Sequence, residues 1–111
     1  MNREKWVKLT EIASVIRSKN AGPYELTFDL IFRDEQLFQR VTKGGTLTKH
    51  LIADIFQIQE AQVFSILPYP PAKAIKITIE RPRPSGSLGE TDVYGAQQHG
   101  PLLDLEVFLA D

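Results

Sequence analysis

The sequence predicts an α+β fold of two layers, with helices packed on one face of a β-sheet. In several segments apolar residues alternate with polar ones, which is the pattern of a strand with one buried face. Between these segments, apolar residues recur three and four positions apart, which is the pattern of an amphipathic helix. The 111 residues, of which 42% are hydrophobic, suit a single domain over residues 1–111 that buries about two thirds of its unfolded surface.

The clearest strand pattern covers residues 24–32. Every second residue from Tyr24 to Phe32 is large and apolar, and a Gly-Pro pair comes directly before the strand. The segment upstream is ambiguous. Its apolar residues are Leu9, Ile12, Ala13 and Ile16. Because they have helical spacing and Thr10 suits an N-cap, we predict a short helix over residues 10–18, with a strand as the open alternative.

Two helices are predicted after the strand at 24–32. Asp34 suits the N-cap of the first helix, which Gly44 and Gly45 end. Thr46 or Thr48 suits the N-cap of the second helix. The residues expected to be buried are Leu37, Phe38 and Val41 in the first helix, and Leu51, Ile52, Ile55 and Phe56 in the second.

The rest of the chain predicts three more strands. Residues 63–67 form a short apolar run, and a cluster of three prolines connects it to the alternating segment 73–81. We expect these two strands to pair as a hairpin. A closing strand is predicted over residues 103–109, with Phe108 on the face opposite Leu105 and Val107.

These elements predict a sheet that is mixed but mainly antiparallel. The two helices form a crossover, so the strands at 24–32 and 63–67 are expected to run in the same direction. The hairpin then reverses the chain, and the closing strand is expected to begin at the edge where the strand at 73–81 ends. Two polar segments, 17–23 and 90–101, would then lie at that edge and face a common cleft.

The segment 90–101, with the sequence ETDVYGAQQHGP, belongs to a long loop, and such loops in compact domains are commonly functional or disordered. A pair of His99 with Asp92 would suit acid/base chemistry, because a carboxylate orients an imidazole and raises its basicity. The alternative is that His99 caps a turn. Gln97 and Gln98 offer uncharged donors and acceptors, either for an amide or carboxylate ligand or for the backbone of the loop.

The segment 17–23, with the sequence RSKNAGP, carries two cations close together. Arg17 and Lys19 suit a phosphate or carboxylate, with Arg81 and Arg83 assisting from the end of the opposite strand. The alternative is that this segment only ends a helix. The candidate site residues are therefore His99 and Asp92 for catalysis, and Arg17, Ser18, Lys19, Asn20, Tyr94, Gln97 and Gln98 for binding a substrate or a partner.

Composition excludes several classes of function. A net charge of −1 and a pI near 6.1 provide no field for polyanions, so we expect no nucleic-acid partner. The chain has no cysteine, so thiolate metal ligands and disulfides are absent. Asp92, His99, Glu90 and Asp104 could at most supply a weak, oxygen-rich metal site, so we expect neither a metal nor a cofactor. No apolar run reaches the ~20 residues of a membrane span, and the N-terminus is charged from the start, so we expect a cytoplasmic protein that binds no membrane.

Four segments together resemble a known family. They are IRSKNAGPYELTFDLIF, LT at 47–48, AIKITIERP, and GETDVYGAQQHGPLLDLEV. In these the chain resembles the small uncharacterised domains that accompany AtuA-type proteins of acyclic terpene utilisation, either encoded beside them or similar to their C-terminal ferredoxin-like domain. The resemblance implies a ferredoxin-like variant of the two-layer sandwich.

The resemblance also implies a role. The chain would be a small accessory or co-catalytic subunit of a larger AtuA-type protein in the catabolism of branched acyl-CoA or hydroxy-acid compounds. The alternative is a stand-alone lyase or hydratase that uses His99 as general base. A terminal strand is often a sheet edge that pairs with another chain, so we also expect a homo-oligomer when the partner is absent.

Overall fold

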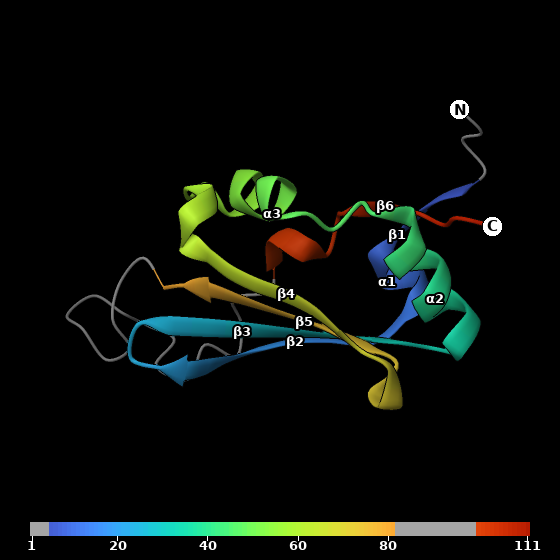
Figure 1. The fold of residues 1–111 in the computed structure, drawn as a ribbon, viewed down its shortest axis with the longest axis horizontal. Helices are drawn as coiled ribbons and strands as arrows, with labels where there is room; N and C mark the ends of the chain where they lie inside the picture. The colour runs from blue at the N-terminus through green and yellow to red at the C-terminus, as the bar shows by residue number, and fades with distance from the viewer. Residues whose placement is uncertain (1–4, 82–99) are drawn as a thin grey trace.

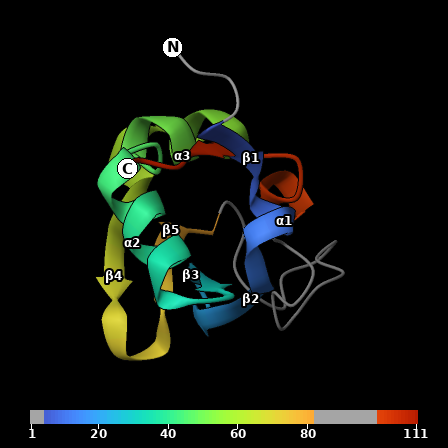
Figure 2. The same ribbon diagram turned by 90° about the vertical axis from the view of Figure 1, so that its right-hand side faces the viewer.

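The computed structural model describes residues 5–81 and 100–111, and their elements form two layers (Figure 1). A four-stranded sheet makes one layer. The described α-helices and a two-stranded sheet make the other, so the helices lie on one face of the main sheet (Figures 1 and 2). The predicted α+β two-layer sandwich is confirmed.

The bounds of the elements follow the sequence patterns closely between residues 24 and 81 and poorly before and after that range. The strands are β1 (Trp6–Lys8), β2 (Ala13–Gly22), β3 (Glu25–Phe32), β4 (Val63–Tyr69), β5 (Ala74–Glu80) and β6 (Glu106–Phe108). The helices are α1 (Leu9–Ile12), α2 (Glu35–Gly44) and α3 (Lys49–Phe56). Three short 3₁₀ turns are η2 (Glu60–Gln62), η3 (Pro70–Ala72) and η4 (Gly100–Leu102).

The main sheet has the strand order β2-β3-β5-β4, and all of its described pairs are antiparallel. The predicted hairpin of β4 and β5 is confirmed. Because β3 and β4 both pair antiparallel with β5, they run in the same direction, as predicted, but they are not neighbours. Along the described chain the order of strands and α-helices is β1-α1-β2-β3-α2-α3-β4-β5-β6, which differs from βαββαβ.

The predicted helix over residues 10–18 is wrong, and the alternative of a strand applies from residue 13. The helical spacing is real only in α1, where Leu9 and Ile12 are buried. From Ala13 the chain pairs with β3 along a ten-residue strand. Neighbouring Val15 and Ile16 are β-branched, which favours an extended backbone, and the ladder to β3 decides the matter.

Helix α2 begins and ends where the sequence predicts, and α3 begins at Thr48, one of its two candidate caps. The Asp34 side chain accepts a hydrogen bond from the backbone N–H of Leu37 at 2.8 Å, and the Thr48 hydroxyl accepts one from Leu51 at 3.1 Å. Thr46, the other candidate cap, instead accepts a hydrogen bond from the backbone N–H of Phe108 at 3.0 Å. Thr46 therefore ties the segment between the helices to β6.

The predicted closing strand over residues 103–109 is wrong in length and in partner. Only β6 is extended, and it pairs with β1, outside the main sheet. The alternation of buried and half-buried residues does hold: Val107 is buried, and Phe108 packs on the other side against Trp6, with ring centroids 5.4 Å apart. The error arose because β1 carries no sequence pattern that identifies it as a strand.

The core lies between the two layers. The main sheet contributes the alternating apolar residues of β3 and β5, and the helices contribute their inward faces. Phe28 of β3, for example, is fully buried and stacks on Phe56 of α3 with ring centroids 4.8 Å apart. The opposite face of the main sheet is covered by no described helix (Figure 1).

Candidate functional site

The uncovered face of the main sheet has an ordered arrangement of side chains. Residues opposite one another on neighbouring strands point to the same face, so the strand register groups them into rows. The charged row consists of Arg17, Asp29, Lys76 and Leu67. The apolar row, on the side of η3, consists of Val15, Ile31, Ala74 and Tyr69. The polar row, on the other side of the charged row, consists of Lys19, Thr27, Thr78 and Ser65.

A groove of about 540 Å³ lies over the charged and apolar rows and reaches Lys19 of the polar row. Its lining residues are Arg17, Lys19, Asp29, Ile31, Leu67, Pro68, Tyr69, Ala72, Ala74 and Lys76. Leu67 and Tyr69 form its apolar wall and are 57% and 58% exposed. Exposed apolar side chains of this size that border a hollow are typical of a binding surface.

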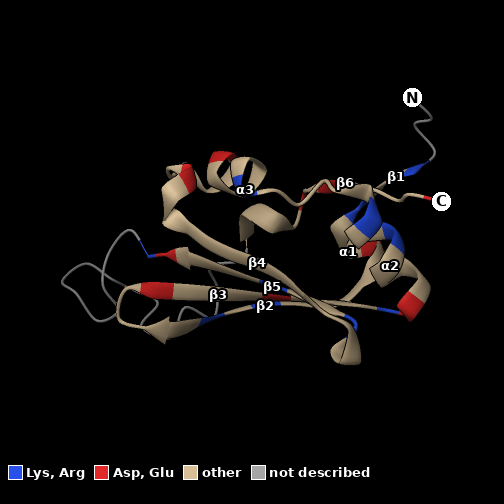
Figure 3. Ribbon diagram, viewed as in Figure 1, with Lys and Arg blue, Asp and Glu red and all other residues tan. Residues whose placement is uncertain are grey.

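The groove has an excess of positive charge, because its lining includes three cations and one carboxylate. Basic and acidic residues both occur along the strands of the main sheet (Figure 3). The Arg17 Nε donates to Asp29 Oδ2 at 3.1 Å, so one edge of the guanidinium is held by the sheet. Neither Lys19 nor Lys76 makes an ion pair with another residue in the described part of the chain. Because both ammonium groups lie on the exposed face, they are available to an anion from outside.

The structure separates the predicted binding residues of the segment 17–23 into two groups. Because this segment is a strand, alternate side chains point to opposite faces. Arg17 and Lys19 line the groove, whereas Ser18 and Asn20 point to the face that the helices cover. The expectation that all of these residues face one cleft came from interpreting the segment as a loop after a helix.

Arg81 does not assist Arg17 and Lys19, contrary to the sequence-based expectation, and Arg83, the other residue expected to assist, lies outside the described residues. It follows the buried isoleucines of β5 with the same alternation, is only 4% exposed, and donates from Nη1 to Asn20 Oδ1. Its backbone N–H also donates to the carbonyl oxygen of Tyr24 at 2.7 Å. Arg81 therefore closes the end of the sheet on the covered face.

The residues predicted for catalysis lie outside the described part of the chain. They are His99 and Asp92, together with the predicted binding residues Tyr94, Gln97 and Gln98. The proximity predicted between this segment and Arg17 or Asn20 falls outside it as well.

Residues 5–81 and 100–111 contain no acid/base constellation at the groove. His50 lies on α3 and approaches Glu60 at 3.3 Å, with both side chains largely exposed and neither lining the groove. The same residues contain no group of three or more histidine, aspartate or glutamate side chains that could hold a metal ion. They also include no helix that is long and apolar enough to cross a membrane.

Sequence reasoning missed the contributions of β4 and β5 to the groove. Lys76 and Leu67 belong to the predicted hairpin, and the alternation of Ile75 and Ile77 already indicates that Lys76 points away from the core. What the sequence does not contain is the position of β5 beside β3, which brings Lys76 opposite Asp29. The pairing register of the predicted hairpin was the signal that could have placed Lys76 opposite Leu67.

Comparison with known proteins shows a family but no characterised relative. No curated protein and no solved structure matches the chain. The family described as a domain of unknown function, DUF4387, matches residues 9–106. This match covers β2 to β5 and extends to the first residue of β6, so it includes all the residues of the groove. The protein therefore belongs to the DUF4387 family.

Proposed function

We propose that this protein is a small cytoplasmic accessory or co-catalytic subunit of a larger AtuA-type protein, acting in the catabolism of branched acyl-CoA or hydroxy-acid compounds. In this role it supplies a ligand-holding surface, and the larger protein supplies the rest of the reaction site. The AtuA-type partner is suggested by the sequence resemblance. The supporting role is suggested by the groove.

The single observation that carries the proposal is the composition of the groove. It combines cations available to an anion with an exposed apolar wall, and its one carboxylate among the described residues, Asp29, is buried and held by Arg17. Such a surface can bind and orient a ligand. Its described residues include no histidine and no second carboxylate that could form an acid–base pair with Asp29. An open face with Leu67 and Tyr69 exposed is also suited to being covered by another protein.

Copurification from the native host tests the proposal. A tagged chain is expected to retain the AtuA-type protein, identified by mass spectrometry. Leu67→Arg should lower that retention at least about tenfold, because it places a charge in the apolar wall of a buried contact. Leu103→Arg is the matched control, since Leu103 is 41% exposed and does not line the groove. It should leave retention unchanged.

Two results would count against the subunit role. One is recovery of the tagged chain without any AtuA-type protein from cells that produce both. The other is equal retention by Leu67→Arg and Leu103→Arg at equal amounts of folded protein, which would separate the association from the groove.

A further inference from the structure

We infer that the groove holds a carboxylate with an apolar carbon skeleton, the carboxylate at the charged row and the skeleton on the apolar row. This inference rests on the proposed ligand-holding role and names the ligand class. It follows from three features of the uncovered face: a positioned guanidinium, further cations beside it, and an apolar wall at a fixed distance along the strands.

The guanidinium of Arg17 is positioned in advance. Asp29 accepts the Nε hydrogen bond at 3.1 Å, and its side chain is only 10% exposed, so this anchor is fixed in the sheet. Among the described residues, the terminal Nη nitrogens of Arg17 have no acceptor in the groove. A planar guanidinium with free terminal N–H groups matches the two oxygens of a carboxylate.

Lys76 completes the head-group site. The register places Lys76 on the other side of Asp29 from Arg17, so the two cations flank a single buried carboxylate within one row. Lys19, one row further, adds a third positive charge. Asp29 neutralises part of this charge, and the remainder attracts an anion of low charge.

A carboxylate fits the donors better than a phosphate does. Phosphate sites in proteins commonly use backbone N–H groups at helix N-termini or in loops, in addition to cations. On this face the backbone N–H groups of β3 and β5 belong to the sheet ladders. No described α-helix begins in the groove, and the 3₁₀ turn η3, which begins next to Tyr69, opens with two prolines that have no N–H to donate. The available donors are side chains of the charged and polar rows. These donors are enough to bind the two oxygens of a carboxylate.

The apolar row sets the shape of the rest of the ligand. It lies two residues along the strands from the charged row, which corresponds to about 7 Å. Ile31, Ala74 and Tyr69 form its floor and wall, and Leu67 continues the wall into the charged row. The volume of about 540 Å³ exceeds the needs of a carboxylate alone and lies within the range of small-molecule sites.

Titration of the full chain with octanoate, followed by NMR chemical shifts, tests the inference without the partner protein. We expect octanoate to bind at least about tenfold more tightly than acetate, because acetate lacks the apolar skeleton. Octylamine, which has the same chain but a cationic head, should not bind. The perturbed amides should map to β2, β3, β4 and β5 around the groove.

Variants separate the head-group site from general surface charge. Lys76→Gln should weaken octanoate binding about three- to tenfold, and it is expected to fold because Lys76 is exposed. Lys49→Gln is the matched control, since Lys49 is also exposed but lies on α3, and it should leave binding unchanged. Arg17→Lys retains the charge but loses the fork, so it should still weaken binding, by about threefold.

The inference is overturned if octylamine binds as well as octanoate, if octyl phosphate binds more tightly than octanoate, or if Lys76→Gln and Lys49→Gln behave alike. Its failure is distinguishable from failure of the subunit role. Octanoate binding is measured in the absence of a partner, whereas copurification is measured without added ligand, so either result stands without the other.

Discussion

Asp29 shows at the scale of one residue how a buried carboxylate prepares a cationic surface. It lies on the central strand β3, between Arg17 on one side and Lys76 on the other, and is nearly buried on a face that no described helix covers. A carboxylate so placed is stable only with cations around it. Asp29 therefore keeps Arg17 in place, and both cations face the groove.

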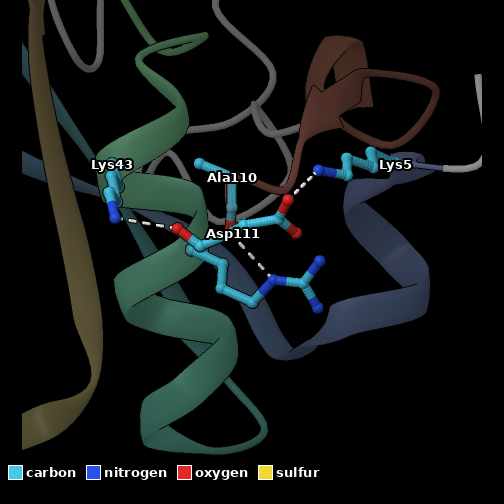
Figure 4. Close-up of polar contacts among 5 residues, drawn as sticks. Lys5, Lys43, Ala110 and Asp111 are labelled. Carbon is cyan, nitrogen blue, oxygen red and sulfur yellow. Dashed lines mark hydrogen bonds and ion pairs between the residues drawn. The ribbon is translucent and has the colours of Figure 1, made fainter. Parts of the chain in front are cut away.

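Asp111 offers a test of electrostatics at the same scale (Figure 4). Lys5 Nζ donates to the side-chain carboxylate of Asp111, and Lys43 Nζ donates to the backbone oxygen of Asp111 at 2.8 Å. Arg40 Nε donates to the carbonyl oxygen of Ala110 at 3.0 Å. The hydrogen bond and charge of Lys5, with smaller effects of Arg40 and Lys43, lower the pKa of Asp111 below its ordinary 3.8.

The pH dependence follows from the direction of this shift. A carboxyl pKa that is lower in the folded state stabilises the fold above the unfolded pKa, and the stabilisation is lost as pH falls through the folded pKa. We expect the stability difference between the native chain and Asp111→Asn to be constant near neutral pH and to shrink below about pH 4. Urea unfolding of both proteins at a series of pH values measures this difference in stability. A difference that stays constant into strong acid would contradict the assignment.

At the scale of elements, the contact between α2 and β6 depends on two adjacent glycines with different functions. Gly45 has a φ of 70°, and a Cβ added there would meet nothing within 4 Å, so only its conformation requires glycine. Gly44 has no such conformation, but its added Cβ would collide with the backbone carbonyl oxygen of Phe108. Gly44 therefore allows β6 to approach α2 closely, and Gly45 allows the helix to end.

Substituting each glycine by alanine separates these functions. Gly45→Ala should cost about 1–2 kcal/mol of unfolding free energy through left-handed strain. Gly44→Ala should cost about 2–3 kcal/mol, since backbone atoms must move. It should also change the fluorescence of Trp6, the single tryptophan, which packs on Phe108. Equal losses of stability, with unchanged fluorescence in both variants, would contradict this explanation.

At the scale of the whole molecule, the strand order leaves β2 and β4 as the edges of the main sheet. The sequence placed self-association at the closing strand, but β6 lies in the helical layer and pairs with β1. Homo-oligomer formation remains a prediction, and the edge strand β4 is the surface best suited to form the interface. This edge strand exposes Phe64, Leu67 and Tyr69, and exposed apolar edges invite pairing with another chain.

Light scattering measures this prediction directly. In the absence of a partner protein we expect a mass of at least twice 12.5 kDa. Phe64→Lys should reduce it to that of the monomer, because a charge on the edge strand opposes pairing. Tyr24→Lys is the control, since Tyr24 is 60% exposed but lies between β2 and β3. A monomer at high concentration, or equal masses for both variants, would remove β4 as an interface.

The sequence by itself determined the elements whose partners are local. Caps at Asp34 and Thr48, the alternation in β3, and the β4–β5 hairpin are all encoded within a few residues, so they were predicted from the pattern alone. It also identified Arg17 and Lys19 as candidate anion ligands. The physical reason is that capping, alternation and tight turns depend on chemistry within the same segment.

Only the tertiary structure decided the rest. Whether residues 13–18 form a helix or a strand depended on the ladder to β3, and β6 was paired by a three-residue strand at the other end of the chain. The groove likewise required β5 to lie beside β3, because that neighbour brings Lys76 and Leu67 to Arg17 and Asp29. Pairings of this kind join residues far apart in sequence, and no local pattern encodes them.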